Sequence, residues 1–208
     1  MIYSEKHKFV YMPVPKTGTT TLSSVLFEDF EAKHWDFNGI VPIRKNIRDK
    51  KGIWPKHIIH LPKELEKYFV FSTIRNPYRH VMSQYWNFCF VQKQQTSMKG
   101  FQEWLELVFI ESFYNLLKIS DDYQPPKGCV KFKSDVYIDV DEKISDQFNL
   151  LPFVKKPIML PHLKRSIKNG LFYTEEMAAL VVEKRKIDFD YFGYSYELPE
   201  DLRKPCLQ

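Results

Sequence analysis

Two short segments of the chain combine the residue types that bind phosphate-like anions. The first, Pro15-Lys-Thr-Gly-Thr-Thr-Thr21, offers one lysine, one glycine and four threonines. The second, Arg75-Asn-Pro-Tyr-Arg-His-Val-Met-Ser83, offers two arginines and one serine. Arginine forks and hydroxyl groups donate hydrogen bonds to phosphate or sulfate oxygens, and lysine adds a mobile positive charge. The two segments therefore predict an anionic ligand.

The first segment is expected to connect a strand to a helix. Lys8–Val14 is rich in aromatic and β-branched residues, and the apolar residues over 22–30 recur at helical spacing. N–H groups at a helix start lack intrahelical acceptors, and the helix dipole favours an anion there. The predicted ligand contacts are Lys16, Thr17, Gly18, Thr19, Thr20 and Thr21. The loop is not a G-x-x-x-x-G-K-[ST] motif, because the lysine precedes the glycine.

The second segment is also expected to follow a strand, here Tyr68–Ile74. Asn76-Pro77 is typical of a helix start, with asparagine as the N-cap and proline as the first helical residue. Arg75 then lies at the carboxyl end of the strand, where open α/β sheets bind ligands. Arg79 and Ser83 are four residues apart and share one face of the helix. This arrangement predicts a second phosphate site.

Further elements complete an α/β pattern. They are a short helix over residues 62–67, a helix over 101–119, a strand over Asp135–Val140 and a helix over Glu175–Lys186 capped by Thr174. Strands that alternate with helices predict an α/β layer fold with a mainly parallel sheet. We expect one domain over residues 1–208.

Composition narrows the class of protein. Of 208 residues, 44% are hydrophobic and 27% charged, which is typical of a globular chain, and the net charge of +5 is too weak and dispersed to indicate a nucleic-acid partner. Three scattered cysteines, Cys89, Cys129 and Cys206, indicate neither a disulfide framework nor a zinc site. The chain shows no signal peptide and no apolar run of the ~20 residues needed to insert in a membrane. A cytoplasmic location is predicted, and oligomeric state is left open.

Taken together, the two motifs resemble those of the sulfotransferases that use 3′-phosphoadenosine 5′-phosphosulfate (PAPS). Pro15–Thr20 resembles the 5′-phosphosulfate loop of that superfamily, and Arg75-Asn-Pro followed by Ser83 resembles its 3′-phosphate motif. The likeness is closer to the carbohydrate branch, whose first motif reads like V-P-K-T-G. Segments near the C-terminus, 161–166, 173–176 and 188–194, are similar to the closing part of that branch. Lys164 departs from it, because the pattern has asparagine there.

The resemblance implies a P-loop-like three-layer fold and an activity. The enzyme would move the sulfuryl group of PAPS to a hydroxyl acceptor, a carbohydrate in this branch, and release adenosine 3′,5′-bisphosphate without a metal. Lys16 would stabilise charge on the bridging oxygen, which makes it a catalytic residue. Arg75 and Ser83 would hold the 3′-phosphate, and Arg165 would close over that phosphate or the ribose.

A general base should accept the proton of the acceptor hydroxyl. Related carbohydrate sulfotransferases place a histidine in this region of the chain, and Lys56-His-Ile-Ile-His60 offers two. We favour His57 as the catalytic base. His60 and Glu64 are the alternatives.

Two other functions stay open on the sequence alone. A small P-loop kinase would bind ATP and Mg²⁺, but strand 68–74 carries no aspartate to hold the metal. A non-catalytic module could bind anionic polymers through the basic segments Arg44–Lys51 and Lys164–Lys168. That reading leaves the two phosphate motifs unexplained.

Overall fold

The computed structural model describes residues 1–35, 60–107, 112–125, 128–161 and 170–203. The chain forms two compact units, each assembled from two separate stretches of sequence. Unit 1 consists of Met1–Ile74 and Asn115–Lys164, and unit 2 consists of Arg75–Tyr114 and Arg165–Gln208. The first motif belongs to unit 1 and the second to unit 2, so each is described within its own unit.

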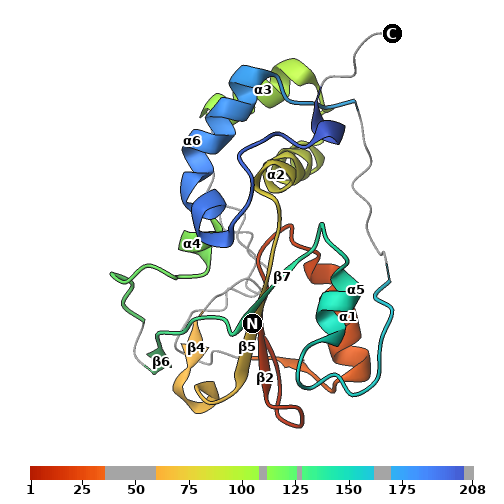
Figure 1. The fold of residues 1–208 in the computed structure, drawn as a ribbon, viewed down its shortest axis with the longest axis vertical. Coiled ribbons are helices and arrows are strands. Elements are labelled where there is room, and N and C mark those ends of the chain that lie inside the picture. The colour runs from red at the N-terminus through yellow and green to blue at the C-terminus, as the bar shows by residue number, and fades with distance from the viewer. Residues whose placement is uncertain (36–59, 108–111, 126–127, 162–169, 204–208) are drawn as a thin grey trace. The chain divides into compact units, whose positions relative to one another are not determined.

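Unit 1 contains a five-stranded sheet in the order β3-β1-β2-β5-β7 (Figure 1). Its strands are β1 (Ile2–Ser4), β2 (Phe9–Met12), β3 (Lys33–His34), β5 (Phe69–Ile74) and β7 (Val136–Asp139). The strands β2, β5 and β7 pair in parallel, with Val10 opposite Val70 and Phe71 opposite Val136. The α/β fold with a central, mostly parallel sheet is therefore confirmed. At one edge, β1 pairs antiparallel with β2 and β3. These two edge strands were not predicted, because β1 and β3 are too short to carry a strand pattern.

Two helices of unit 1, α1 (Thr19–Asp29) and α5 (Ile144–Asn149), lie on the same side of this sheet in Figure 1. Strand side chains alternate between faces, so Phe9 and Tyr11 point to one face, and both belong to the core built with these helices. The ring of Phe153 stacks on Phe9 with centroids 4.2 Å apart. The other buried members of this core are Ile2, Leu22, Val25, Leu26, Phe30, Phe71, Ile138, Phe148, Leu151 and Leu160. This packing fixes the carboxyl ends of the parallel strands.

Unit 1 also contains a smaller two-stranded sheet, whose first strand precedes β5 in the sequence and whose second strand follows it. It pairs β4 (Leu61–Pro62) with β6 (Cys129–Val130) in antiparallel fashion. The short helix expected over 62–67 is a single 3-10 turn, η2 (Lys63–Leu65). Along the chain, β4 and η2 lead into the amino end of β5.

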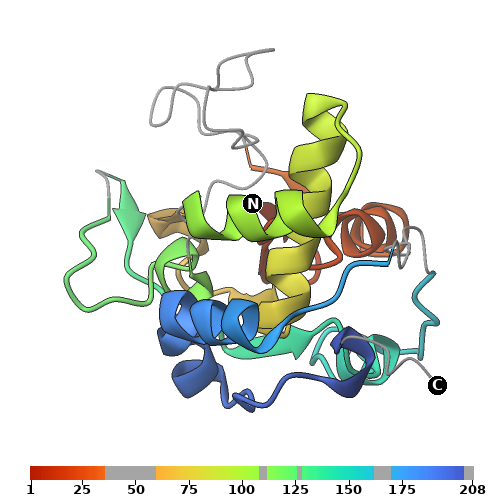
Figure 2. The ribbon, with the colours of Figure 1, turned by 90° about the horizontal axis from the view of Figure 1, so that it is seen from above.

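Unit 2 is helical (Figure 2). Its elements are α2 (Pro77–Gln92), α3 (Met98–Leu107), α6 (Glu175–Phe192) and the 3-10 turn η3 (Glu200–Leu202), together with the first two residues of α4 (Phe113–Leu116). Helix α6 packs against both α2 and α3, and rings such as those of Tyr85 and Phe101 join α2 to α3 with centroids 5.0 Å apart. The single helix expected over 101–119 is wrong, because α3 ends at Leu107 and α4 begins at Phe113. The predicted cap of α6 is confirmed, since Thr174 Oγ1 accepts from the N–H of Met177 at 3.3 Å.

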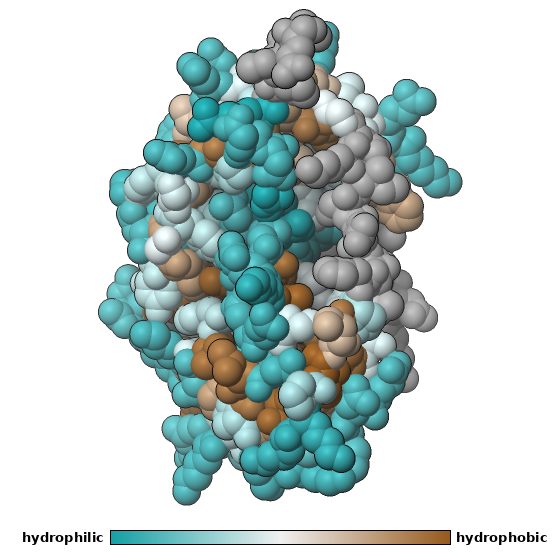
Figure 3. Space-filling view, turned by 45° about the vertical axis from the view of Figure 1, so that its right-hand side comes forward, coloured by the Kyte–Doolittle hydropathy of each residue, from teal (hydrophilic) through white to brown (hydrophobic). Residues whose placement is uncertain are grey.

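Some large apolar side chains remain on the surface. Figure 3 shows apolar side chains between hydrophilic ones on the face that it presents. Leu150 and Met159 of unit 1 are 84% and 85% exposed. In the part of the chain that the structure describes, no helix combines the length and apolar character needed to cross a membrane.

Candidate anion-binding site

The first motif forms the turn between β2 and α1. Gly18 is the N-cap of α1 with φ of +69°, and Lys16 also adopts a left-handed conformation with φ of +67°. That conformation costs a non-glycine residue about 1 kcal/mol, so it persists at Lys16 only with support from its surroundings. A Cβ atom at Gly18 would lie 3.4 Å from Cγ1 of Val140, which follows β7. The positive φ, more than crowding, favours glycine here.

Helix α1 begins with its main-chain donors directed out of the helix end. Its first turn closes with Leu22 N donating to Gly18 O at 3.2 Å, so the N–H groups of Thr19, Thr20 and Thr21 have no acceptor within the helix. No side chain of the described residues caps this end, and the first turn contains no acidic residue. Amide donors and the positive end of the helix dipole together favour an anion.

The threonine hydroxyls of the loop divide into two groups. Thr17 Oγ1 donates to Val14 O at 2.8 Å and lies 2.6 Å from Thr73 Oγ1. Thr19 Oγ1 also donates to Val14 O at 2.8 Å, and both threonines are buried. These two hydroxyls hold the loop instead of reaching outward, so any ligand contact at Thr17 or Thr19 rests on the main-chain N–H groups. Thr20 is exposed and Thr21 is half-buried.

The second motif begins α2 as predicted. Asn76 Oδ1 accepts from the N–H of Tyr78 at 3.1 Å and of Arg79 at 3.5 Å, and Pro77 is the first helical residue. Arg75 is half-buried and follows β5 directly in the sequence, and Ser83 is buried two turns into α2. The local signals of the sequence thus place Arg75 at a strand end, as expected.

Arg79 has a different partner from the one that the sequence suggested. Its guanidinium pairs in a fork with Asp201, with Nη1–Oδ2 at 3.1 Å and Nη2–Oδ1 at 2.7 Å. The expectation that Arg79 forms an arginine fork toward phosphate is therefore corrected for this structure, because Asp201 of η3 already occupies that fork. Asp201 lies 122 residues away, and no spacing rule identifies such a partner.

The neighbours of Arg79 on α2 are also held by the C-terminal stretch of unit 2. Tyr173 donates its hydroxyl to Tyr78 O at 2.7 Å, and Tyr78 donates its own hydroxyl to Tyr196 O at 2.6 Å. Burial raises the pKa of Tyr173 well above its usual value, which keeps this hydroxyl a donor. The first turn of α2 is therefore fastened by both main-chain and side-chain contacts.

His80, the residue after Arg79 on α2, belongs to a fully buried ionic cluster. Arg185 Nε donates to Asp188, and its Nη1 lies 3.0 Å from Nδ1 of His80. The carboxylate of Asp188 also accepts from the N–H groups of Phe113 and Tyr114, each at 3.0 Å. Burial lowers the pKa of Arg185, and the neighbouring carboxylate opposes that shift. No signal in the sequence identifies this cluster, because its members come from three separate helices.

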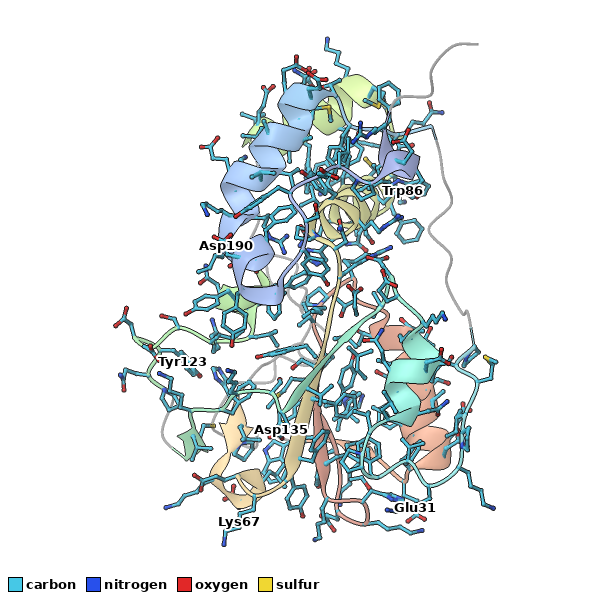
Figure 4. The ribbon with its side chains drawn as sticks, in the orientation of Figure 1. Glu31, Lys67, Trp86, Tyr123, Asp135 and Asp190 are labelled. Atoms are coloured by element: carbon cyan, nitrogen blue, oxygen red, sulfur yellow. The ribbon has the colours of Figure 1, made fainter. Side chains whose placement is uncertain are left out.

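The candidate bases differ in what the structure shows of them. His57 lies outside the described residues, as does Arg165, the expected contact of the 3′-phosphate or ribose. His60 Nδ1 hydrogen-bonds the hydroxyl of Tyr123, a residue labelled in Figure 4, and the two rings stack with centroids 6.1 Å apart. Burial, and then the charge of Lys118, lower the pKa of His60, which favours the neutral ring that a general base requires.

Glu64 is exposed on η2, which leads into the amino end of β5. Loop 15–21 instead follows the carboxyl end of β2, and parallel strands share their carboxyl ends at one edge. His60 and Glu64 both precede the amino end of β5, so their positions in unit 1 do not separate them as candidate bases. Within the described ranges, no group of three or more His, Cys, Asp or Glu residues is arranged to hold a metal ion.

Comparison with curated proteins and with solved structures gave no significant match. A family model described as "Sulfotransferase family" matches residues 1–151. The match spans most of the chain and includes the loop between β2 and α1, the start of α2 and the strand β7. On this evidence, the chain belongs to the sulfotransferase family.

Proposed function

We propose that the chain transfers a sulfuryl group from PAPS to a hydroxyl group of a carbohydrate. The observation that carries the proposal is the start of α1. Its amide N–H groups lack intrahelical acceptors, Gly18 forms the N-cap in a left-handed conformation, and Lys16 stands beside them, also left-handed. A 5′-phosphosulfate needs such donors, because its charge is spread over several oxygens.

The residues of the second motif suit the other end of the nucleotide. Arg75 follows a parallel strand directly, and the hydroxyl of Ser83 adds a neutral donor on α2. Arg79 is not included in this set, because Asp201 pairs with it. Arg165 completes the proposed 3′-phosphate contacts from the C-terminal stretch.

PAPS supplies an activated sulfuryl group, and adenosine 3′,5′-bisphosphate is the leaving group. The contribution of the chain is to orient the donor and to stabilise negative charge, as in phosphoryl transfer. Lys16 provides the positive charge next to the amides of α1, where charge develops on the leaving oxygen. His57 takes the proton of the acceptor hydroxyl, and His60 is the second candidate for that role.

The experiment that tests this function is transfer of labelled sulfate from PAPS to a panel of glycans. We expect incorporation into at least one hydroxyl-bearing glycan in the presence of EDTA, and its loss in Lys16→Ala. Simple alcohols and tyrosine peptides in the same panel test the acceptor class. Labelling of one of these alone would contradict the carbohydrate assignment and leave the sulfotransferase assignment intact.

The same assay with ATP and Mg²⁺ in place of PAPS tests the kinase alternative. We expect no phosphoryl transfer under those conditions. Transfer from ATP without transfer from PAPS would overturn the proposal.

A further inference from the structure

Three buried hydroxyl groups of unit 1 connect β2, β5 and loop 15–21. The hydroxyl of Tyr11 on β2 lies 2.9 Å from Thr73 Oγ1 on β5. Thr73 Oγ1 lies 2.6 Å from Thr17 Oγ1, which donates to Val14 O at 2.8 Å. All three side chains are fully buried. The loop is thus fastened to the strand that reaches Arg75 two residues later.

The number of available protons determines which of these three hydroxyls donates and which accepts in each hydrogen bond. Each hydroxyl has one proton to donate. The proton of Thr17 goes to Val14 O, so Thr17 accepts from Thr73, and Thr73 in turn accepts from Tyr11. Burial raises the pKa of Tyr11 to about 12, so its hydroxyl remains a donor at neutral pH. Thr73 is the central member, and its loss would break both of its hydrogen bonds.

We propose that Thr73 is a positioning residue that holds loop 15–21 in its anion-binding conformation. This inference rests on the proposed function, since it assumes that the loop binds the 5′ end of the nucleotide. The hydroxyls of Thr17 and Thr19 converge on Val14 O, immediately before the left-handed Lys16. Because the Thr17 and Thr19 hydroxyls both bond to the Val14 carbonyl, the main-chain N–H groups that follow keep their orientation when no ligand is bound. Preorganised donors bind an anion more tightly than donors that must first be ordered.

The adjacent residue on β5 provides a matched control. Ser72 Oγ lies 2.6 Å from Ser134 Oγ, and both serines are buried. Neighbouring residues of a strand point to opposite faces, so this pair is directed away from Tyr11. Loss of either pair removes a buried hydroxyl contact, but only the Thr73 contact reaches the loop.

The test measures binding of two nucleotides to the full chain by calorimetry. Adenosine 3′,5′-bisphosphate carries the 5′-phosphate that the loop would bind, and adenosine 3′-monophosphate lacks it. In Thr73→Val, we expect the Kd for the bisphosphate to rise about tenfold, the effect of losing buried hydrogen bonds. The Kd for the monophosphate should not change. Thr73→Ser should restore the wild-type ratio of the two constants, and Ser72→Ala should keep it.

An unchanged ratio in a folded Thr73→Val variant would overturn the inference, as would an equal change in Ser72→Ala. If Thr73→Val does not fold, Tyr11→Phe removes the hydroxyl that donates to Thr73, and we expect the same selective loss at about threefold. An unchanged ratio in that variant would also overturn the inference. Failure of the wild-type chain to bind the bisphosphate would instead overturn the proposed function.

Discussion

Loop 15–21 in unit 1 and the first turns of α2 in unit 2 are both held by side-chain contacts, but the chemistry differs. The loop rests on neutral hydroxyls, those of Tyr11, Thr73 and Thr17. Helix α2 is held by the ionic pair of Arg79 with Asp201 and by the buried Arg185 beside His80. The loop therefore depends on hydrogen bonds between neutral groups, whereas α2 depends on charged pairs in addition to neutral hydrogen bonds.

The two motifs also differ in how far along the sequence their stabilising partners lie. The main-chain anchor of the loop, Val14 O, is three residues from Thr17 and five from Thr19. The partners of α2 are 95 to 122 residues away, on the C-terminal stretch of unit 2. The loop thus combines a local anchor with one contact to β5, while the start of α2 is completed only when the C-terminal stretch folds. Changes in charge should consequently damage unit 2 more than unit 1.

The largest expected loss of unfolding free energy follows from a change in the buried ionic cluster of Arg185, Asp188 and His80. Asp188→Ala leaves the charge of Arg185 buried without its carboxylate, and such a loss costs about 3–5 kcal/mol of unfolding free energy. Chemical denaturation monitored by circular dichroism measures it. Asp190→Ala is the control on the same helix, because the ion pair of Asp190 with Lys186 is exposed (Figure 4) and should contribute little. Equal effects of the two substitutions would contradict the role given to the cluster.

The next effect separates activity from stability in unit 1. Lys16→Ala should lower kcat by about 10²–10³-fold, the typical loss when one preorganised charge-stabilising group is removed. The unfolding free energy should stay within about 0.5 kcal/mol, because Lys16 is not a core residue. Sulfate transfer and denaturation of the same preparation give both values. A variant with full activity would remove Lys16 from the mechanism.

Two arginines of unit 2 offer a sharper comparison. Arg75→Ala should weaken adenosine 3′,5′-bisphosphate binding about tenfold or more, and leave binding of adenosine 5′-monophosphate unchanged. Arg79→Ala should instead cost about 1 kcal/mol of stability through its partly exposed pair with Asp201, without changing nucleotide preference. Calorimetry with both nucleotides distinguishes the variants. A reversed result would make Arg79 the phosphate ligand.

The smallest effect concerns pH. Burial and Lys118 lower the folded-state pKa of His60 below its usual 6.5, so near that pH the unfolded chain binds more protons than the folded one. The unfolding free energy should therefore fall as pH decreases from about 7 to 5. In His60→Phe this part of the dependence should disappear. Denaturation curves of both proteins at each pH measure the difference, and identical slopes would rule out the assigned shift.

Local signals made much of the structure predictable. The strand at 68–74, the Asn76 cap and the Thr174 cap follow from propensities and capping preferences over a few residues. The order of motifs also placed the loop correctly between β2 and α1. These features need no knowledge of distant partners.

The contacts that join distant residues were not predictable. No local sequence signal identifies the partners of Asp201 and Asp188, yet one forms a fork with Arg79 and the other is fully buried with Arg185. The inward direction of Thr17 also depends on Thr73, 56 residues later. Burial of a polar side chain is decided by the partner that tertiary packing brings to it, and no periodicity encodes that partner.

The central claim is that this chain binds a nucleotide phosphorylated at both its 3′ and 5′ positions. Isothermal titration calorimetry of the full chain with adenosine 3′,5′-bisphosphate in EDTA tests it most directly. The account predicts saturable binding that is weakened by Lys16→Ala and by Arg75→Ala separately. No binding by the folded wild-type chain, or equal binding by all three proteins, would contradict it.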